Sequence, residues 1–316
     1  MNDVKDFRPQ AIDEMVGQHG VVEQVRVGLK AAKMDDTAYP HTLAVGPAGV
    51  GKTQLAHLIA DSMNTSFSET LGESLSNAAQ LNQFLLAGTQ VDRAVLVIDE
   101  AHSIPKPQQT RLLIALSENK LVYEGHKGPQ SIPLGRFTLI MASTEQWSLL
   151  GPLISRLRVL NFDYYSPLEL TTLLDRRVKG LGWAVEAGVL TDIAKRGRGV
   201  PRHALNLLAS ARMVARSEGH KTIRIDDANR AFALEGVDEL GLGPVERAYL
   251  DRLSSGPSRL NVVASVLGLP SRTVQGIEST LIRFDLITKT NSGTRELTRA
   301  GRDHLATNRP VSASIV

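Results

Sequence analysis

The stretch that decides the fold is residues 41–60, HTLAVGPAGVGKTQLAHLIA. HTLAV (41–45) is a short, largely apolar run typical of a buried strand, and TQLAHLIADSM (53–63) is amphipathic, as a helix on a sheet is. Between them, residues 46–53 match the pattern GxxxxGK[ST] of a phosphate-binding loop. Such a loop turns successive backbone N–H groups toward phosphate oxygens at a helix N-terminus. The sequence therefore predicts a nucleoside triphosphate site on a strand–loop–helix unit.

Each residue type in this loop has an expected task. Lys52 would reach the β- and γ-phosphates, and the Thr53 hydroxyl would ligate Mg²⁺. The residues expected to bind the nucleotide here are Gly46, Gly49, Gly51, Lys52, Thr53 and Gln54. Cofactors expected from this pattern are ATP and Mg²⁺.

A pair of carboxylates supports the same site. Asp99 and Glu100 close the apolar run AVLVI (94–98), 47 residues after Lys52. Alone, such a pair is more often a helix cap. Because open α/β sheets bind ligands at the carboxyl ends of their strands, the phosphate-binding loop favours a catalytic role. Asp99 is expected to hold Mg²⁺, and Glu100 to orient the attacking water.

Three more polar side chains are candidates with a less specific pattern. Ser143 and Thr144 end the run FTLIMA (137–142), where a side chain can touch the γ-phosphate or the water. The same pair could be an ordinary strand-to-loop junction. His102 could equally cap or pack.

The surrounding pattern predicts an α/β domain. Apolar runs at 94–98, 137–142 and 159–165 (VLNFDYY) favour buried strands, and QQTRLLIALSE (108–118) favours a helix. Strands that alternate with helices indicate a largely parallel sheet. We place this domain at residues 1–165.

The rest of the chain predicts two smaller domains. Ser166 to Glu169 form a capping box with Pro at the first helical position, and helical periodicity continues to about residue 235, which predicts an all-α domain at 166–238. The glycine-rich stretch 236–245 resembles a linker. Three helical segments (245–254, 258–267 and 271–285) and two β-like runs within 286–298 then predict a winged helix at 239–310.

Composition narrows the function classes. The 316 residues include no cysteine, which excludes disulfides and thiol chemistry, and no apolar run approaches the length of a membrane span. The N-terminus resembles no secretory signal, so we expect a cytoplasmic protein. Residues 1–150 carry 12 Lys and Arg against 16 Asp and Glu, whereas residues 151–316 carry 24 against 17. A basic C-terminal half is compatible with a polyanion-binding part, or with scattered solvated charges.

Taken in order, these motifs resemble AAA+ ATPases, and more closely the RuvB family of Holliday junction branch-migration motors. The segments that carry the resemblance are FRPQAIDEMVGQ (7–18), GPAGVGKTQLAHLIA (46–60), VLVIDEAH (95–102), GRGVPRHALNLL (197–208), GVDELGL (236–242), SGPSRLNVVASVLGL (255–269) and FDLITKT (284–290). The similarity extends over residues 7–300, domain order included.

The resemblance implies a homo-hexameric ring that uses ATP hydrolysis to move duplex DNA or a four-way junction. It implies that Thr144 is a first sensor, that Arg202 is a second sensor, and that Arg156 is an arginine finger acting on the neighbouring subunit's nucleotide. It also implies that Arg8 and Tyr165 line the adenine and ribose.

The chain departs from the family pattern in four places. Ile154 stands where the family has arginine two residues before the finger, and Glu145 stands where it has arginine after the sensor strand. The hairpin that binds the partner RuvA corresponds to 119–135, which is shorter and less apolar here and weakens the case for a RuvA-like partner. The wing has lost basic residues, which leaves Lys289 and Arg295 as the expected DNA phosphate contacts.

Two functions from different classes stay open at this point. One is a DNA translocase that grips phosphates rather than bases. The other is an AAA+ loader or regulator that remodels a protein partner on DNA. A superfamily-two helicase is excluded, since the all-helical segment 166–235 leaves no room for a second motor domain of α/β type.

Overall fold

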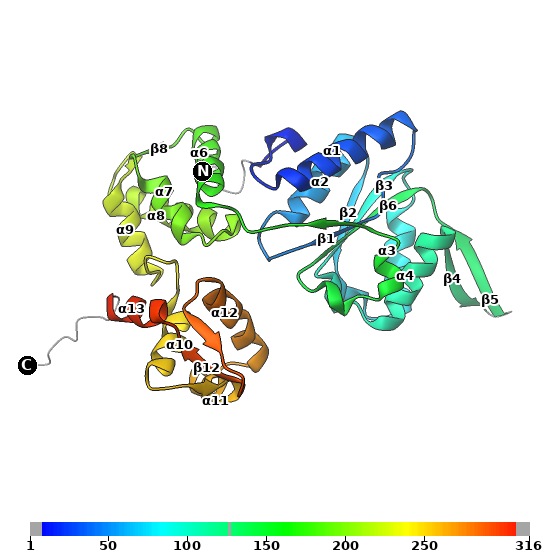
Figure 1. Ribbon diagram of the computed structural model, residues 1–316. Helices are drawn as coiled ribbons and strands as arrows, with labels where there is room; N and C mark the ends of the chain where they lie inside the picture. The colour runs from blue at the N-terminus through cyan, green and yellow to red at the C-terminus, as the bar shows by residue number, and fades with distance from the viewer. Residues whose placement is uncertain (1–7, 126–127, 308–316) are drawn as a thin grey trace, which may run out of the picture. The chain divides into compact units, whose positions relative to one another are not determined.

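The computed structural model describes residues 8–125 and 128–307. The chain forms two compact units, coloured along the chain in Figure 1. The first runs to Ala184 and includes Gly197–Ala209, and the second comprises Val185–Arg196 and the chain from Ser210 on. Both units share the helices of the expected lid, so the domain boundaries at 165/166 and 238/239 stay predictions.

A five-stranded sheet, parallel throughout, forms the centre of the first unit. Its order is β2-β3-β6-β1-β7, which puts β6 between the strand before the phosphate-binding loop and the strand that ends in Asp99. The strands are β1 (Thr42–Val45), β2 (Phe67–Leu71), β3 (Ala94–Asp99), β6 (Phe137–Ser143) and β7 (Arg158–Asn161). The parallel sheet predicted from the sequence is confirmed.

Helices cover both faces of this sheet (Figure 1). Leu96 and Ile98 of β3 pack into one apolar cluster with α3, α4 and α5, whereas α2 contacts β3 and β6 from the other side. Because side chains alternate along a strand, the apolar run of β3 supplies both layers. The helices are α1 (His19–Met34), α2 (Lys52–Met63), α3 (Ala78–Gly88), α4 (Lys106–Glu118) and α5 (Gly151–Ile154), with 3₁₀ turns η1 (Ile12–Glu14), η2 (Gly72–Leu75), η3 (Ala101–Ser103) and η4 (Gln146–Ser148).

One strand was not predicted, and one strand prediction needs correction. The polar segment FSETL forms the edge strand β2, although its exposed Glu69 and half-exposed Ser68 and Thr70 give no apolar run. The strand expected at 159–165 ends at Asn161, because β7 pairs only with β1, and β1 itself ends at Val45. Beyond that point the backbone leaves the sheet, and the Tyr165 N–H donates to the Gly199 carbonyl instead.

A separate antiparallel hairpin extends from the body of the first unit (Figure 1). It consists of β4 (Lys120–Gly125) and β5 (Gly128–Pro133). It coincides with the segment 119–135 in which the RuvA-binding hairpin was expected, and residues 126–127 of that segment lie outside the described residues.

The segment after β7 is helical, as predicted. It contains α6 (Pro167–Gly180), α7 (Val189–Arg196), α8 (Pro201–Ser217) and α9 (Ile225–Leu234), with the short strands β8 (Ala184–Val185) and β9 (Thr222–Ile223). The capping box of α6 is confirmed: the Glu169 N–H donates to Ser166 Oγ over 3.2 Å, and the Ser166 N–H donates to Glu169 Oε2 over 2.8 Å. None of the described helices is long and apolar enough to cross a membrane.

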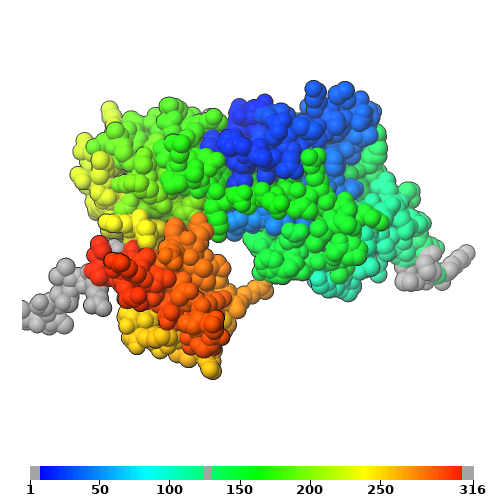
Figure 2. All heavy atoms as spheres, viewed as in Figure 1, coloured from blue at the N-terminus to red at the C-terminus, as the bar shows by residue number. Residues whose placement is uncertain are grey.

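The second unit ends in a winged helix, which forms one compact body from α10 onward (Figure 2). A three-stranded antiparallel sheet in the order β10-β12-β11 packs with four helices. The elements are α10 (Pro244–Ser254), β10 (Ser258–Arg259), α11 (Leu260–Leu267), α12 (Ser271–Arg283), β11 (Ile287–Lys289), β12 (Thr294–Leu297) and α13 (Arg299–Thr307). The strands β11 and β12 form the wing. The final helix was not predicted, and the tail after it lies outside the described residues.

The linker expected at 236–245 is wrong for its central part. Leu242 is fully buried in the winged-helix core. The Asp238 carboxylate accepts hydrogen bonds from the N–H groups of Leu240 and Leu242, and its other oxygen lies 2.9 Å from His304 Nε2 of α13. The glycines on either side of this turn led to the prediction of a linker, because a glycine-rich composition is typical of flexible segments.

Candidate nucleotide site and nucleic-acid interface

The first unit contains a cavity of about 670 Å³ around the phosphate-binding loop. Its lining comes from the N-terminal segment, the loop, the ends of β2 and β3, α6 and the start of α8. The expected site residues found there are Arg8, Gly49, Gly51, Lys52, Thr53, Gln54, Asp99, Glu100, Tyr165 and Arg202. Gly46, Thr144 and Arg156 are not among the lining residues.

Two glycines of the loop have backbone geometry that other residues would strain. Gly46 has φ +150°, and a Cβ there would lie 2.3 Å from the carbonyl oxygen of Phe162. Gly49 has φ +77°, and a Cβ there would lie 3.0 Å from Val200 and from Arg202. The loop therefore packs closely on β7's continuation and on the start of α8.

Lys52 is the first residue of α2, and its side chain folds back over the loop. Its side chain is buried, and Nζ donates to the carbonyl oxygens of Gly46 (2.8 Å) and Pro47 (2.7 Å). Burial lowers the pKa of the Lys52 ammonium; Asp99 and Glu100 oppose that shift, whereas Arg202 adds to it. A desolvated ammonium held over a backbone loop is well placed to attract phosphate oxygens.

Thr53 and Asp99 come together although 46 residues separate them. The Thr53 hydroxyl donates to Asp99 Oδ2 over 3.1 Å, joining the first turn of α2 to the end of β3. A hydroxyl and a carboxylate oxygen are hard donors, as Mg²⁺ requires, and Mg²⁺ takes few protein ligands beside water and phosphate. The pair therefore matches the kind of ligand that the ion takes, and among the described residues no group of three or more His, Cys, Asp or Glu side chains could hold a metal.

Glu100 lies in a short chain of polar contacts. Its backbone is left-handed (φ +50°), and its N–H donates to Asp99 Oδ1 over 2.8 Å. Its Oε2 lies 3.2 Å from His102 Nε2, and His102 Nδ1 lies 3.4 Å from Ser143 Oγ at the end of β6. The two residues with the weakest sequence pattern, His102 and Ser143, therefore connect to the carboxylate that lines the cavity.

The two other arginines expected from the resemblance lie in different settings. Arg202 is the second residue of α8 and lines the cavity. Its backbone N–H donates to the carbonyl oxygen of Gly49 over 3.3 Å. Arg156 follows α5 and is exposed, with Nε donating to Ser117 Oγ of α4 over 3.0 Å. Thr144 follows β6 and is half-buried.

Apolar side chains also line the cavity, among them Val16, Leu173 and Leu205. Tyr165 is buried there, and its phenol donates to the Val50 carbonyl oxygen over 3.3 Å. Burial raises the pKa of this phenol to about 12, so it stays protonated as a donor. Gln54 Nε2 donates to the Pro9 carbonyl oxygen over 3.5 Å, which ties the N-terminal segment of Arg8 to the loop helix.

Several cavity residues escaped sequence reasoning. Arg177 of α6 is buried and lines the cavity, as Tyr165 does. Burial lowers the pKa of its guanidinium, and the nearby Arg8 adds to that shift. The other lining residues without an expected role include His57, Glu69 and Asn206. No motif assigns them a role. Arg177 and Asn206 reach the cavity from α6 and α8, whereas His57 and Glu69 belong to α2 and β2.

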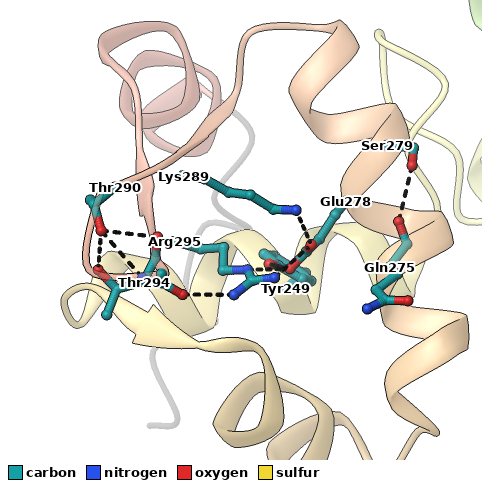
Figure 3. Close-up of polar contacts among 9 residues, drawn as sticks. Tyr249, Gln275, Glu278, Ser279, Lys289, Thr290, Thr294 and Arg295 are labelled. Carbon is teal, nitrogen blue, oxygen red and sulfur yellow. Dashed lines mark hydrogen bonds and ion pairs between the residues drawn. The ribbon is translucent and has the colours of Figure 1, made fainter.

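In the winged helix, two residues were expected to contact DNA phosphates, Lys289 and Arg295, and they differ in exposure. Arg295 is buried, and its Nε and Nη2 donate to the two carboxylate oxygens of Glu278 over 2.7 and 3.2 Å (Figure 3). The sequence predicts a DNA phosphate contact from Arg295, whereas the structure has its guanidinium bound to Glu278 inside the domain. Lys289 is half-exposed, with Nζ 3.7 Å from Glu278 Oε2.

The parallel sheet, the glycine loop with Lys52 and Thr53, and the Asp99–Glu100 pair at the end of the buried strand define a class. The chain is a P-loop nucleoside triphosphatase of the AAA+ type with a helical lid and a winged helix.

Three family models match consecutive parts of the chain. Residues 7–162 match the Holliday junction DNA helicase RuvB P-loop domain, 165–238 the RuvB AAA lid domain, and 239–306 the RuvB C-terminal winged helix domain. The chain belongs to the RuvB family.

Individual relatives agree with this assignment. The chain is 35% identical to a Holliday junction branch migration complex subunit RuvB of Nocardia farcinica over 95% of its length and 86% of the relative's. It is 35% identical to the subunit of the same name from Mycobacterium tuberculosis H37Rv, over 98% and 92%. Among solved structures, the Thermotoga maritima RuvB Holliday junction branch migration motor superposes with a TM-score of 0.82 at 30% identity, covering 96% of this chain and 99% of that one. A variant of that protein gives a TM-score of 0.85 at the same identity, covering 96% of this chain and 100% of that chain.

Proposed function

We propose that this chain is an ATP-driven motor that moves Holliday junction branches in recombination and repair, as a ring of six subunits around duplex DNA. The observation that carries the proposal is the Thr53–Asp99 hydrogen bond of 3.1 Å beside Lys52. It occurs in a chain that matches three RuvB domain models between residues 7 and 306. The relatives are named as branch migration subunits, which favours this function over a protein-remodelling loader.

The cavity supports binding of ATP with Mg²⁺. Lys52 attracts the β- and γ-phosphates, and Thr53 and Asp99 hold the ion, which neutralises charge on the phosphate oxygens. The base and ribose then lie against Tyr165 and the Arg8 segment, which also line the cavity. Apolar lining on Pro9, Val16, Leu173 and Leu205 suits a flat purine ring.

Hydrolysis needs a water held in line with the γ-phosphate. Glu100 is placed at the cavity wall, and its contact with His102 restricts the rotation of its carboxylate. β6 lies between β1 and β3 in the sheet. Ser143 and Thr144 follow the end of β6, so they lie between the phosphate-binding loop, which follows β1, and Asp99, which ends β3. Thr144 then serves as a sensor of the γ-phosphate, and His102 links the Glu100 carboxylate to that strand.

Two arginines complete the proposed cycle. Arg156, exposed and outside the cavity of its own chain, supplies the positive charge to the neighbouring subunit's nucleotide. Arg202 carries the nucleotide state to helix α8 through its contact with the loop at Gly49. Hydrolysis in one subunit thus depends on the next, which is why the proposal includes a ring.

The winged helix is the proposed DNA contact, with Lys289 as a phosphate ligand. A motor that moves along any sequence should bind the backbone rather than base edges, so its affinity should depend strongly on salt. We do not propose a RuvA-like partner, because the segment 119–135 departs from the partner-binding hairpin that the resemblance implies. We expect the protein to act in the cytoplasm, where its DNA substrate is.

The test is ATP hydrolysis by the purified protein at moderate salt, without DNA, with linear duplex and with a four-way junction. Lys52→Met is the control, since it removes the phosphate-binding ammonium. Stimulation by duplex or junction that the control lacks supports the proposal. A rate that no DNA changes would contradict an autonomous DNA motor and point to a protein substrate.

A further inference from the structure

One buried carboxylate joins three elements of the winged helix. Glu278 of α12 is 2% exposed, and it accepts a hydrogen bond from the Tyr249 phenol of α10 over 2.7 Å. Its two oxygens also accept from Nε and Nη2 of Arg295 in β12. Figure 3 shows these groups converging on one carboxylate between helix and wing.

A second cation lies at the edge of this cluster. Lys289 of β11 stands directly opposite Arg295 in the wing, and its Nζ lies 3.7 Å from Glu278 Oε2. The Lys289 side chain is 52% exposed, whereas the Arg295 side chain is 11% exposed. Of the two cations, Arg295 is therefore bound inside, and Lys289 can reach a ligand outside the domain.

The charges of these three groups do not balance. Arg295 alone neutralises Glu278, and it does so with the paired geometry that guanidinium groups prefer on carboxylates. It also donates from Nη1 to the Gly293 carbonyl oxygen over 2.7 Å, which fixes the turn of the wing. With Arg295 in place, Lys289 is the surplus positive charge of the cluster.

We propose that Arg295 is a positioning residue that neutralises Glu278, so that Lys289 stays available to a phosphate of duplex DNA. This rests on the proposed DNA binding by the winged helix. If Arg295 is removed, a buried carboxylate needs another cation, because unpaired buried charge is strongly unfavourable. Lys289 is the nearest candidate among the described contacts, and it is then held away from DNA by Glu278.

The experiment measures the salt dependence of duplex binding by the full chain. Fluorescence anisotropy of a labelled duplex, titrated across KCl concentrations, gives the slope of log K against log salt. Each phosphate contact contributes about 0.9 to this slope. We expect Lys289→Met and Arg295→Met each to lower the slope by about 0.9 for every subunit that contacts the duplex. Combining them should lower it no further.

A charge-neutral pair separates positioning from simple damage to the fold. In the double variant Glu278→Gln with Arg295→Met, no carboxylate remains to hold Lys289, so the slope should return to that of the unaltered protein. Arg295→Lys keeps a cation beside Glu278 and should also keep the slope, even if Arg295→Met does not fold. Arg230→Met removes an exposed arginine that pairs with Glu218 in the lid, and as the matched control it should leave the slope unchanged.

The outcomes are distinct. A full slope in Arg295→Met, or no recovery in the double variant, overturns the role of Arg295. An additive loss in Lys289→Met with Arg295→Met overturns it as well, because it would make both residues direct contacts. If the unaltered protein binds no duplex, the proposed function fails together with this assignment.

Discussion

The Glu100 carboxylate lies 3.2 Å from His102 Nε2. The other ring nitrogen of this histidine lies 3.4 Å from Ser143 Oγ, and that hydroxyl also accepts the N–H of Glu145 over 3.0 Å. The end of β6 is thereby connected to the carboxylate that we assign to water activation. A change in strand β6 that follows the nucleotide state would reach Glu100 through one imidazole ring.

This contact predicts graded losses in hydrolysis. Glu100→Gln should lower kcat for ATP by roughly 10²–10⁴-fold, the usual contribution of a general base, with nucleotide affinity retained. His102→Ala should lower kcat less, because Glu100 stays and only its orientation is lost. Steady-state ATPase assays with fluorescent-nucleotide binding measure both quantities.

Ser143→Ala serves as the control for this chain of contacts, since it removes the hydroxyl but leaves the histidine beside Glu100. It should resemble a weak form of His102→Ala. Equal kcat in His102→Ala and the unaltered protein would contradict a role for the contact.

Much of the nucleotide site could be predicted from the sequence. The glycine loop, Lys52, Thr53 and the Asp99–Glu100 pair occur in contiguous motifs, and the buried strands that carry them are apolar runs. Local patterns suffice there because each motif occupies one strand end, and parallel strands bring those ends to one edge.

Features that depend on contacts between distant segments could not be predicted in the same way. The sequence around Arg295 is that of an exposed wing arginine. Its side chain is buried only because Glu278 of the preceding helix, α12, accepts its hydrogen bond. Arg177 reaches the cavity only because α6 folds over the loop. The turn at Asp238 looks like a linker until His304 of the last helix is beside it.

Arg177 supplies a second prediction. Arg177→Met should raise the Kd for ATP by about 10- to 150-fold, since a charged hydrogen-bond donor that lines the cavity is worth roughly 1.5–3 kcal/mol when its acceptor is present. Its neighbour provides a matched control: Arg176 is exposed, and its Nη1 donates to the Glu14 carbonyl oxygen. Arg176→Met should leave the Kd nearly unchanged. Equal effects of the two variants in nucleotide titrations would exclude a specific contact from Arg177.

Arg156 predicts activity that depends on the neighbouring subunit. Arg156→Ala should reduce ATP hydrolysis by about 10³–10⁵-fold, as removal of an arginine finger does, while nucleotide binding persists. Lys52→Met should be inactive for the opposite reason, because it cannot hold phosphate although its finger is intact.

Mixing these two inactive proteins tests the arrangement. A mixed ring brings an intact Arg156 beside an intact loop at some interfaces, so part of the activity should return as the proportions approach equality. Activity that stays at the level of the separate variants, in a mixture shown to exchange subunits, would mean that Arg156 acts within its own chain.

The last prediction concerns acid stability and rests on His41. The ring is half-buried, and its Nδ1 accepts the N–H of Leu139 over 2.9 Å, which requires an unprotonated nitrogen. Burial lowers the pKa of His41 to about 4, whereas an unfolded chain would have about 6.5. The unfolded state therefore takes up a proton that the folded state refuses, so this contribution to stability is complete above pH 6.5 and is lost as the pH falls toward 4. The loss amounts to about 3 kcal/mol over that window. Urea unfolding at a series of pH values should show the free energy of unfolding falling through this range. His41→Asn, which can still accept from Leu139 but does not titrate, should flatten that part of the profile; the same fall in both proteins would assign it to other groups.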